Sequence, residues 1–193
     1  VRFLESCPSS DGACAVVFTD REGGERAAAS GRKPAWILGS AVRSEPASFP
    51  GRDPVAPVGA ADCAADVYQQ AGITRPLEQI DCAELYVPFS WYEPMWLEGH
   101  HIAAPGDGWK MVESGATALD GSFPVNMSGG VLSSNPIGAS GLLRFAEAAL
   151  QVRGMAGEHQ VDGANVAIAQ AYGASAQYFA MWVVAGSLDP FGA

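Results

Sequence analysis

Two neighbouring stretches decide the fold of this chain: Asn126-Met127-Ser128-Gly129-Gly130, followed closely by Ser134-Asn135-Pro136-Ile137-Gly138-Ala139-Ser140-Gly141. Paired glycines let a backbone approach a ligand closely, and the N–H groups at the start of a helix attract an anion or an oxyanion. An ordinary glycine-rich loop explains the glycines taken alone, but not the order and spacing of the whole stretch. We therefore expect a ligand-binding loop that leads into a helix.

The helix expected after this loop is the clearest in the sequence. Ser140-Gly141 opens it and Arg153-Gly154 closes it. Between these ends the apolar residues form one broad stripe, made of Leu142, Leu143, Phe145, Ala146, Ala149, Leu150 and Val152.

The remaining segments alternate between strand and helix patterns. Short apolar runs predict strands at 13–19, 36–42, 80–87, 161–169 and 177–184. Helical spacing predicts helices from Gly59 to a glycine-terminated end near Gly72, at 89–97 with Pro94 in the first turn, and at 109–113. Residues 20–25 read as a charged turn, and 44–58 as an irregular loop. This alternation predicts an α/β fold, with helices on the faces of a sheet.

Composition narrows the possible partners. The 193 residues are 48% hydrophobic and 17% charged, which is typical of a well-packed globular chain. A formal charge of −10 argues against nucleic-acid and anionic-membrane partners, because both are polyanions. No apolar run reaches the roughly 20 residues of a membrane span, and no signal peptide opens the chain. We expect a cytoplasmic protein.

Cysteine and histidine spacing predicts no metal site. Cys7, Cys14, Cys63 and Cys82 form no CxxC pair, and the last three have apolar neighbours, so we expect reduced, buried thiols. Adjacent residues such as His100 and His101 point in different directions, and His159 falls in a separate turn.

Five stretches together resemble the C-terminal half of thiolase-superfamily proteins. The opening motif is similar to their Asn-x-x-Gly-Gly and His-Pro-x-Gly-x-x-Gly pattern. The others are similar to the Asp-Gly-Ala-Ala-Ala strand, the Glu-x-Asn/His-x-x-Phe loop, the Cys-x-Gly-x-Gly loop and a turn of sterol-carrier-protein-type thiolases, at 10–15, 83–89, 169–175 and 154–161.

This resemblance implies a five-stranded mixed sheet with helices on both faces. Residues 1–33 would hold the last strand of the N-terminal thiolase-like repeat and a linker, and 34–193 the C-terminal domain. Because the chain begins at Val1 without an initiator Met, we expect that an N-terminal portion is missing. Family members form homodimers through that portion.

The chain departs from the thiolase pattern where a thiolase does its chemistry. Asn135 replaces the motif histidine, Ala171 replaces the acid/base cysteine with Tyr172 beside it, and Tyr86 replaces the Asn or His of the middle loop. Thiolysis needs a base that exchanges protons with a thiol, and alanine has no titratable group. We therefore expect no thiolase activity.

The substitutions resemble the lipid-transfer-protein aldolases of bacterial steroid side-chain degradation. That resemblance implies retro-aldol cleavage of a branched 3-hydroxyacyl-CoA into propionyl-CoA and a ketone, with Tyr86 and Tyr172 as acid and base in unassigned order. Asn135 would hold the thioester oxygen. The remaining substrate-binding positions would be Ser128, Gly129, Gly130, Pro136, Gly138 and Gly173.

The same resemblance implies partners but no cofactor other than the CoA carried by the acyl-CoA substrate. The expected partner is a small OB-fold and zinc-ribbon subunit of an enoyl-CoA hydratase. The tail at 187–193 is a candidate docking segment for it, although an apolar tail of this kind is more often disordered.

Several alternatives stay open at this stage. Each site tyrosine could simply pack, as we expect of Tyr68 and Tyr178, and Tyr92 fits either role. The aromatic residues near 89–96 suit a core contact or the wall of an apolar tunnel. Ser134 and Ser140 lack the surroundings of a hydrolase nucleophile. The rival functions are a degenerate thiolase or acyl-CoA acyltransferase, and a non-catalytic acyl-CoA or lipid carrier.

Overall fold

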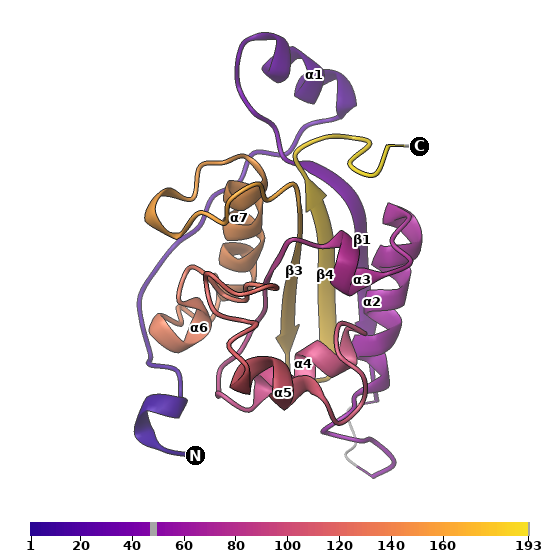
Figure 1. Ribbon diagram of the computed structural model, residues 1–193. Helices are drawn as coiled ribbons and strands as arrows, with labels where there is room; N and C mark the ends of the chain where they lie inside the picture. The colour runs from indigo at the N-terminus through magenta and orange to yellow at the C-terminus, as the bar shows by residue number, and fades with distance from the viewer. Residues whose placement is uncertain (47–49, 193) are drawn as a thin grey trace.

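The computed structural model describes residues 1–46 and 50–192, and its centre is a mixed β-sheet. In this part of the chain the sheet has four strands in the order β1-β4-β3-β2 (Figure 1). Strand β4 runs antiparallel to both β1 and β3, whereas β2 runs parallel to β3. The strand bounds are β1 Trp36–Ser44, β2 Cys82–Glu84, β3 Val166–Gly173 and β4 Tyr178–Ala185. The predicted α/β class is confirmed.

The five strands implied by the family resemblance are not all present among the described residues, and the sheet continues beyond β2 only as a single bridge. Ala83 of β2 pairs in parallel fashion with Val125 alone. Pro124 has no N–H to extend this pairing, and Asn126 turns the chain away with a φ of 53°. The carbonyl of Pro124 and the N–H of Asn126 nevertheless bond to Ala83, at 3.0 and 2.8 Å.

Helices cover both faces of the sheet, as expected. Along β3, Ile168 packs with helices α2 (Val58–Ala71) and α4 (Tyr92–Gly99), whereas Ala167 packs with α7 (Ser140–Val152) on the other face. This alternation follows from the two-residue period of a strand. Small alanines on the α7 side let the helix lie close to the sheet. Figure 1 shows α2 and α7 on opposite sides of β3 and β4.

The helix predictions hold closely. Helix α2 ends before Gly72, whose φ is 71°, and Pro94 is the third residue of α4. Helix α5 spans Gly108–Glu113. Shorter elements complete the chain: α3 Pro76–Gln79, α6 Gly130–Ser133, and 3₁₀ turns at Phe3–Glu5 and Gly157–His159.

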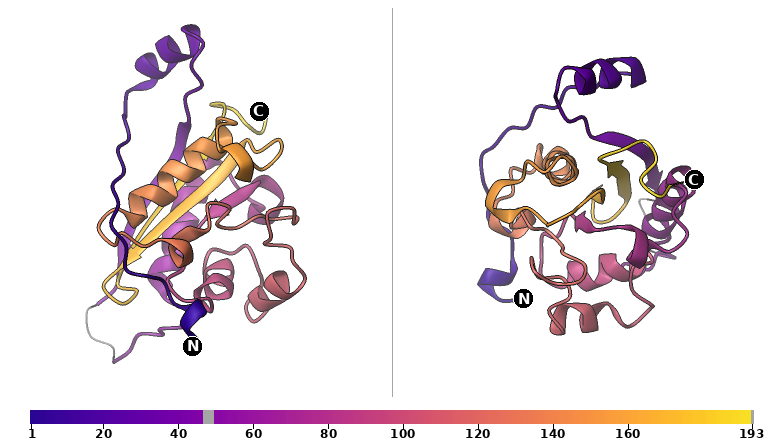
Figure 2. Two further views of the ribbon diagram at one scale, coloured as in Figure 1. Left: turned by 90° about the vertical axis from the view of Figure 1, so that its left-hand side faces the viewer. Right: turned by 45° about the horizontal axis from the view of Figure 1, so that its top comes forward.

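The N-terminal segment differs from the prediction. Residues 13–19 do not form the predicted strand; they run extended over α7 with Val17 94% exposed, and Phe18 packs on Phe145 with ring centroids 5.4 Å apart. The predicted turn at 20–25 is instead the start of helix α1 (Arg21–Ala29). Asp20 caps that helix by accepting a hydrogen bond from the Gly23 N–H at 2.8 Å, and α1 stands apart from the sheet (Figure 2).

Several strand boundaries differ from the predictions, and β3 also runs past its predicted end at 169 to Gly173. The end of β2 and the start of β3 were predicted wrongly because side chains take the backbone hydrogen bonds. Beyond β2, the N–H groups of Leu85 and Tyr86 donate to the side chains of Asn126 and Gln170, at 2.7 and 2.9 Å. At 161–165, before β3 begins, the N–H of Val161 donates to the Gln151 side chain at 2.8 Å.

The predictions for single cysteines and tyrosines are confirmed in part. Cys63 and Cys82 are buried free thiols as expected, but Cys14 is partly exposed. Tyr68 packs in the core and donates to the His100 carbonyl at 2.9 Å, whereas Tyr178, also expected in the core, is 52% exposed. Within residues 1–46 and 50–192, no helix combines the length and apolar character that membrane crossing requires.

Candidate active site

Three polar side chains meet between β2 and α7. The Tyr86 hydroxyl donates to Asn135 Oδ1 at 3.1 Å, and the Ser140 hydroxyl donates to the same oxygen at 2.7 Å. Tyr86 lies just beyond β2, Asn135 in the loop before α7, and Ser140 at the first position of α7. The fold thus joins two motifs that lie 49 residues apart in the sequence.

The backbone of Tyr86 is fixed on both sides. Its N–H donates to Gln170 of β3 at 2.9 Å, and its carbonyl accepts from the indole nitrogen of Trp96 at 2.8 Å. The residue is only 9% exposed. A backbone fixed in this way, together with burial and the bond to Asn135, lets the side chain hold one orientation toward a reacting atom, which favours catalysis.

Tyr172 lies against Tyr86, at the end of β3. Their rings meet edge to face with centroids 5.1 Å apart. The Tyr92 ring also stacks on Tyr172, with centroids 5.4 Å apart, and the Trp96 ring centroid lies 5.2 Å from that of Tyr172. The structure therefore brings together Tyr86, Asn135 and Tyr172, the three predicted catalytic residues, while their roles remain predictions.

The two phenols have different surroundings. Burial raises the pKa of Tyr86, and hydrogen bonding by the Ser140 hydroxyl, which can donate to a phenolate, opposes the rise. Burial also raises the pKa of Tyr172, and a hydrogen bond with the Tyr92 hydroxyl raises it further. Both tyrosines are thus neutral phenols in the unliganded chain. Tyr86 is the easier of the two to ionise, because Ser140 can donate to its phenolate, whereas every neighbour of Tyr172 raises its pKa.

Sequence reasoning missed the contribution of the N-terminal segment to this site. Asn135 Nδ2 donates to Cys7 Sγ at 3.2 Å, and the Asn135 N–H donates to the Ser10 hydroxyl at 3.2 Å. The backbone N–H of Cys7 donates to the Pro88 carbonyl at 2.8 Å, which anchors the segment beside Tyr86. The only signal in the sequence was the closeness of Cys7 to the motif at 10–15.

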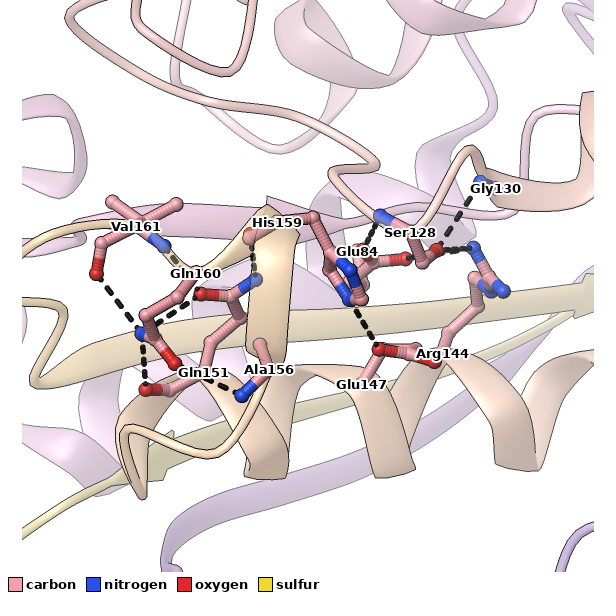
Figure 3. A network of polar contacts seen from close by, with 10 residues as sticks. All are labelled: Glu84, Ser128, Gly130, Arg144, Glu147, Gln151, Ala156, His159, Gln160 and Val161. Carbon is pink, nitrogen blue, oxygen red and sulfur yellow. Dashed lines mark hydrogen bonds and ion pairs between the residues drawn. The ribbon is translucent and has the colours of Figure 1, made fainter.

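Ser128 belongs to a buried polar network that the sequence did not reveal (Figure 3). Glu84 accepts from Arg144 at 2.7 Å and from the Ser128 hydroxyl at 3.0 Å. The Ser128 hydroxyl in turn accepts from the Gly130 N–H at 3.2 Å. Gly129 and Gly130 have φ of 85° and 60°, a backbone conformation that favours glycine. The network fixes the shape of the predicted loop.

The other predicted binding residues lie at two places. Pro136 and Gly138 line an open depression of about 450 Å³, together with the chain from Ser10 to Cys14. Gly173 begins the β3–β4 turn, where its carbonyl accepts from the Gln177 N–H at 3.0 Å. Asp11 also lines the depression, so its charge does not favour a phosphate there.

The aromatic residues 89–96 do not all pack alike. Trp96 is fully buried, whereas Phe89 and Trp91 are 36% and 44% exposed. Tyr92 stacks on Trp91 with centroids 4.0 Å apart and also on Tyr172. The cluster therefore reaches from the core to the surface beside the phenols.

His100 lies inside the same core. Its ring stacks on Trp96 with centroids 5.7 Å apart, and burial lowers its pKa to about 3. In the described part of the chain, no three His, Cys, Asp or Glu side chains group as metal ligands.

Comparison with known proteins identifies the family. A model of the thiolase C-terminal domain-like family matches residues 41–185. This chain belongs to that family. It is 33% identical to sterol carrier protein 2 of Bos taurus over 169 residues, which are 86% of this chain and 31% of the relative. It is 32% identical to an acetyl-CoA acetyltransferase of Methanothermobacter thermautotrophicus over 168 residues, covering 86% of this chain and 43% of the relative.

Similarity to solved structures supports the same fold. The structure named Ltp2-ChsH2(DUF35) aldolase superposes with a TM-score of 0.66 at 22% identity, covering 80% of this chain and 40% of that one. An identity this low shows the fold alone. The chain spans about a third of the sterol carrier protein 2 relatives it matches.

Proposed function

We propose that the protein cleaves a branched 3-hydroxyacyl-CoA, such as one with a steroid side chain, by a retro-aldol reaction. One observation carries the proposal: Tyr86 and Tyr172 lie ring to ring at 5.1 Å, beside Asn135, where Ala171 supplies no thiol base. Two phenols and an amide can move two protons and hold an enolate oxygen, but they cannot perform thiolysis.

The reaction needs one base and one acid. Since a neutral phenol is not a base, one tyrosine must first lose its own proton to solvent. The resulting phenolate removes the proton from the 3-hydroxyl, the C2–C3 bond breaks, and C3 becomes the carbon of a ketone. The electron pair of the broken bond forms the enolate of the thioester. The acid then protonates C2, which gives propionyl-CoA from a 2-methyl substrate. The proton gained by one tyrosine and lost by the other returns through solvent or directly between the neighbouring rings.

Asn135 would stabilise the enolate without titrating. Its Oδ1 accepts from Tyr86 and Ser140, so its Nδ2 is the group able to donate to the thioester oxygen. One hydrogen of Nδ2 points to Cys7, and the other would serve the substrate. Pro136, Gly138 and Gly173 would border the substrate; the Ser128–Gly130 loop would support the site from behind.

The proposal includes partners. A name that joins Ltp2 with ChsH2(DUF35) describes an aldolase that works with a second component. We propose a comparable small OB-fold and zinc-ribbon subunit here, a homodimer formed outside this chain, and a cytoplasmic location. The tail residues Leu188 to Gly192 line a hollow of about 340 Å³ with the end of α2, and this surface is a candidate contact for the subunit.

The test uses the whole protein together with its small partner subunit. A tertiary 3-hydroxyacyl-CoA with a steroid nucleus is added without free CoA, and products are separated by mass-resolved chromatography. We expect propionyl-CoA and a ketone, with kcat reduced at least about a hundredfold in Tyr86→Phe and Tyr172→Phe, the lower end of general acid–base effects. Tyr178→Phe is the matched control because that side chain is exposed. Wild-type rates in both site variants would exclude the mechanism.

Two other functions are supported by the names of relatives. The acetyltransferase relative favours acyl transfer, and the sterol carrier protein 2 relatives favour a non-catalytic carrier. Acyl transfer predicts consumption of free CoA and a covalent acyl-enzyme. A carrier predicts binding of the acyl-CoA without turnover.

A further inference from the structure

The carboxamide of Asn135 is held from both ends. Its Oδ1 receives two hydrogen bonds, from the hydroxyls of Tyr86 and Ser140, and its Nδ2 donates one to Cys7 Sγ. The residue is only 4% exposed, so water cannot easily replace any of these contacts. Hydroxyl and thiol groups can both donate and accept, but neither the Tyr86 nor the Ser140 hydroxyl donates to another acceptor among the hydrogen bonds of residues 1–46 and 50–192. Turning the amide would therefore leave at least one buried O–H proton without an acceptor, which favours the orientation shown.

Rotating the amide by half a turn would reverse its chemistry. Nδ2 would then face Tyr86 and Ser140, and Oδ1 would face Cys7. Tyr86 would lose its acceptor, and the substrate side would present an oxygen to the thioester oxygen, which repels it. Since the site needs an N–H on the substrate side and an acceptor beside Tyr86, the orientation of this amide decides whether it can function.

We propose that Cys7 and Ser140 are positioning residues that fix the orientation of the Asn135 amide. The Cys7 sulfur accepts a hydrogen bond from Nδ2, and the Ser140 hydroxyl donates one to Oδ1. Neither residue touches the reacting atoms. This proposal rests on the proposed function for the substrate-facing N–H, but the orientation itself can be measured without catalysis.

Ser140 has a further effect on Tyr86. The side chain is buried at the first turn of α7, close enough to help lower the pKa of Tyr86 against the effect of burial. When Tyr86 loses its proton, the Ser140 hydroxyl can turn from Asn135 to the phenolate. As long as Cys7 still holds Nδ2 in place, removing Ser140 therefore raises the pKa of Tyr86, whichever of the two catalytic roles Tyr86 plays.

The first experiment is a pH titration of the whole protein carrying tyrosine labelled with ¹³C at Cζ. The signal that disappears in Tyr86→Phe identifies Tyr86. In Ser140→Ala we expect its midpoint to move to higher pH. Ser134→Ala, a change at an exposed serine in the same loop, should leave it in place. An unchanged midpoint in Ser140→Ala would overturn the role of Ser140, whether or not the protein is an aldolase.

The second experiment compares Cys7→Ser with Cys7→Ala in the same titration. Serine keeps an acceptor for Nδ2, whereas alanine frees the amide to turn its N–H toward Tyr86. We expect the Tyr86 midpoint in Cys7→Ala to lie below that in Cys7→Ser. Equal midpoints would refute the positioning role of Cys7.

Turnover adds a separate readout. We expect Cys7→Ser to keep kcat within about threefold of wild type. Cys7→Ala should lose roughly tenfold in kcat with little change in KM, because it removes one hydrogen bond that orients the amide. In the pH dependence of kcat, the transition caused by ionisation of Tyr86 should move to higher pH in Ser140→Ala. Loss of activity in Cys7→Ser, with an acyl group trapped on Cys7 of the wild type, would instead make Cys7 a nucleophile. A protein without activity would refute the proposed function alone.

Discussion

The buried ion pair between Glu84 and Arg144 allows a sharp test of how the site loop is supported. The side chains are 1% and 5% exposed, and their charged atoms lie 2.7 Å apart. Arg144→Met removes the cation and leaves the Glu84 carboxylate in the core. Leaving one member of such a pair unpaired costs about 3–5 kcal/mol, because the remaining charge has lost its water without gaining a partner.

A double-mutant cycle separates pairing from burial. In Glu84→Gln/Arg144→Met no charge remains buried, and the amide introduced at position 84 can still bond to Ser128, so the free energy of unfolding should recover most of the loss. Arg144→Lys keeps the charge but presents it as a point, so we expect an intermediate cost. The control is Arg26→Met, which breaks an ion pair with 67% and 79% exposed side chains and should lie within about 0.5 kcal/mol of wild type.

The assay is urea unfolding of the whole protein, followed by far-UV circular dichroism and tryptophan fluorescence. Free energies come from linear extrapolation, and coincident transitions by both probes are required. A cost below about 1 kcal/mol for Arg144→Met would refute this account of the pair. So would a double variant as unstable as the sum of the single variants, since additive costs mean that the two groups do not interact.

Three further predictions concern stability. Gly141→Ala should destabilise the protein by about 1–2 kcal/mol despite the better helix propensity of alanine, because the new Cβ would lie 2.9 Å from the Ala171 Cβ; thermal unfolding checks this, and adding Ala171→Gly should relieve the clash. Ser175→Gly should raise the melting temperature by relieving a φ of 56° at an exposed turn position, a gain of roughly 1 kcal/mol, and a lowered melting temperature would contradict the strain. Burial lowers the pKa of His100 from 6.5 to about 3, so the folded protein holds this histidine in its neutral form. The resulting stabilisation is fully present above about pH 6.5 and is lost as pH falls toward 3. His100→Phe should therefore flatten the fall in unfolding free energy across that range, whereas a change at the more exposed His159 should not.

Periodicity predicted the elements whose stability comes from local pattern. The stripe of α7 and the glycine end of α2 gave helices with nearly correct bounds, because each signal lies within one segment. Segments whose hydrogen bonds depend on distant side chains were predicted badly. The chain after β2 leaves the sheet because Asn126 and Gln170 take its N–H groups, and no local pattern contains that information.

The residues of the site also differ in how well the sequence predicted them. Family motifs located Tyr86, Asn135 and Tyr172, and the structure brings them together. Cys7 and Arg144 were missed, because their importance lies in which neighbour they reach across the fold. Ser128 was predicted as a substrate contact, yet its hydroxyl is engaged by Glu84 and Arg144.

The central claim is that two tyrosines and an amide break a carbon–carbon bond without a thiol acceptor. The most direct measurement is a single turnover in D₂O, with the whole protein and its partner subunit, read by mass spectrometry of all CoA species. We predict one deuterium at C2 of propionyl-CoA, an unacylated ketone, and no change in the total amount of CoA thioester. Consumption of free CoA with formation of a second acyl-CoA would contradict the account, as would recovery of uncleaved substrate.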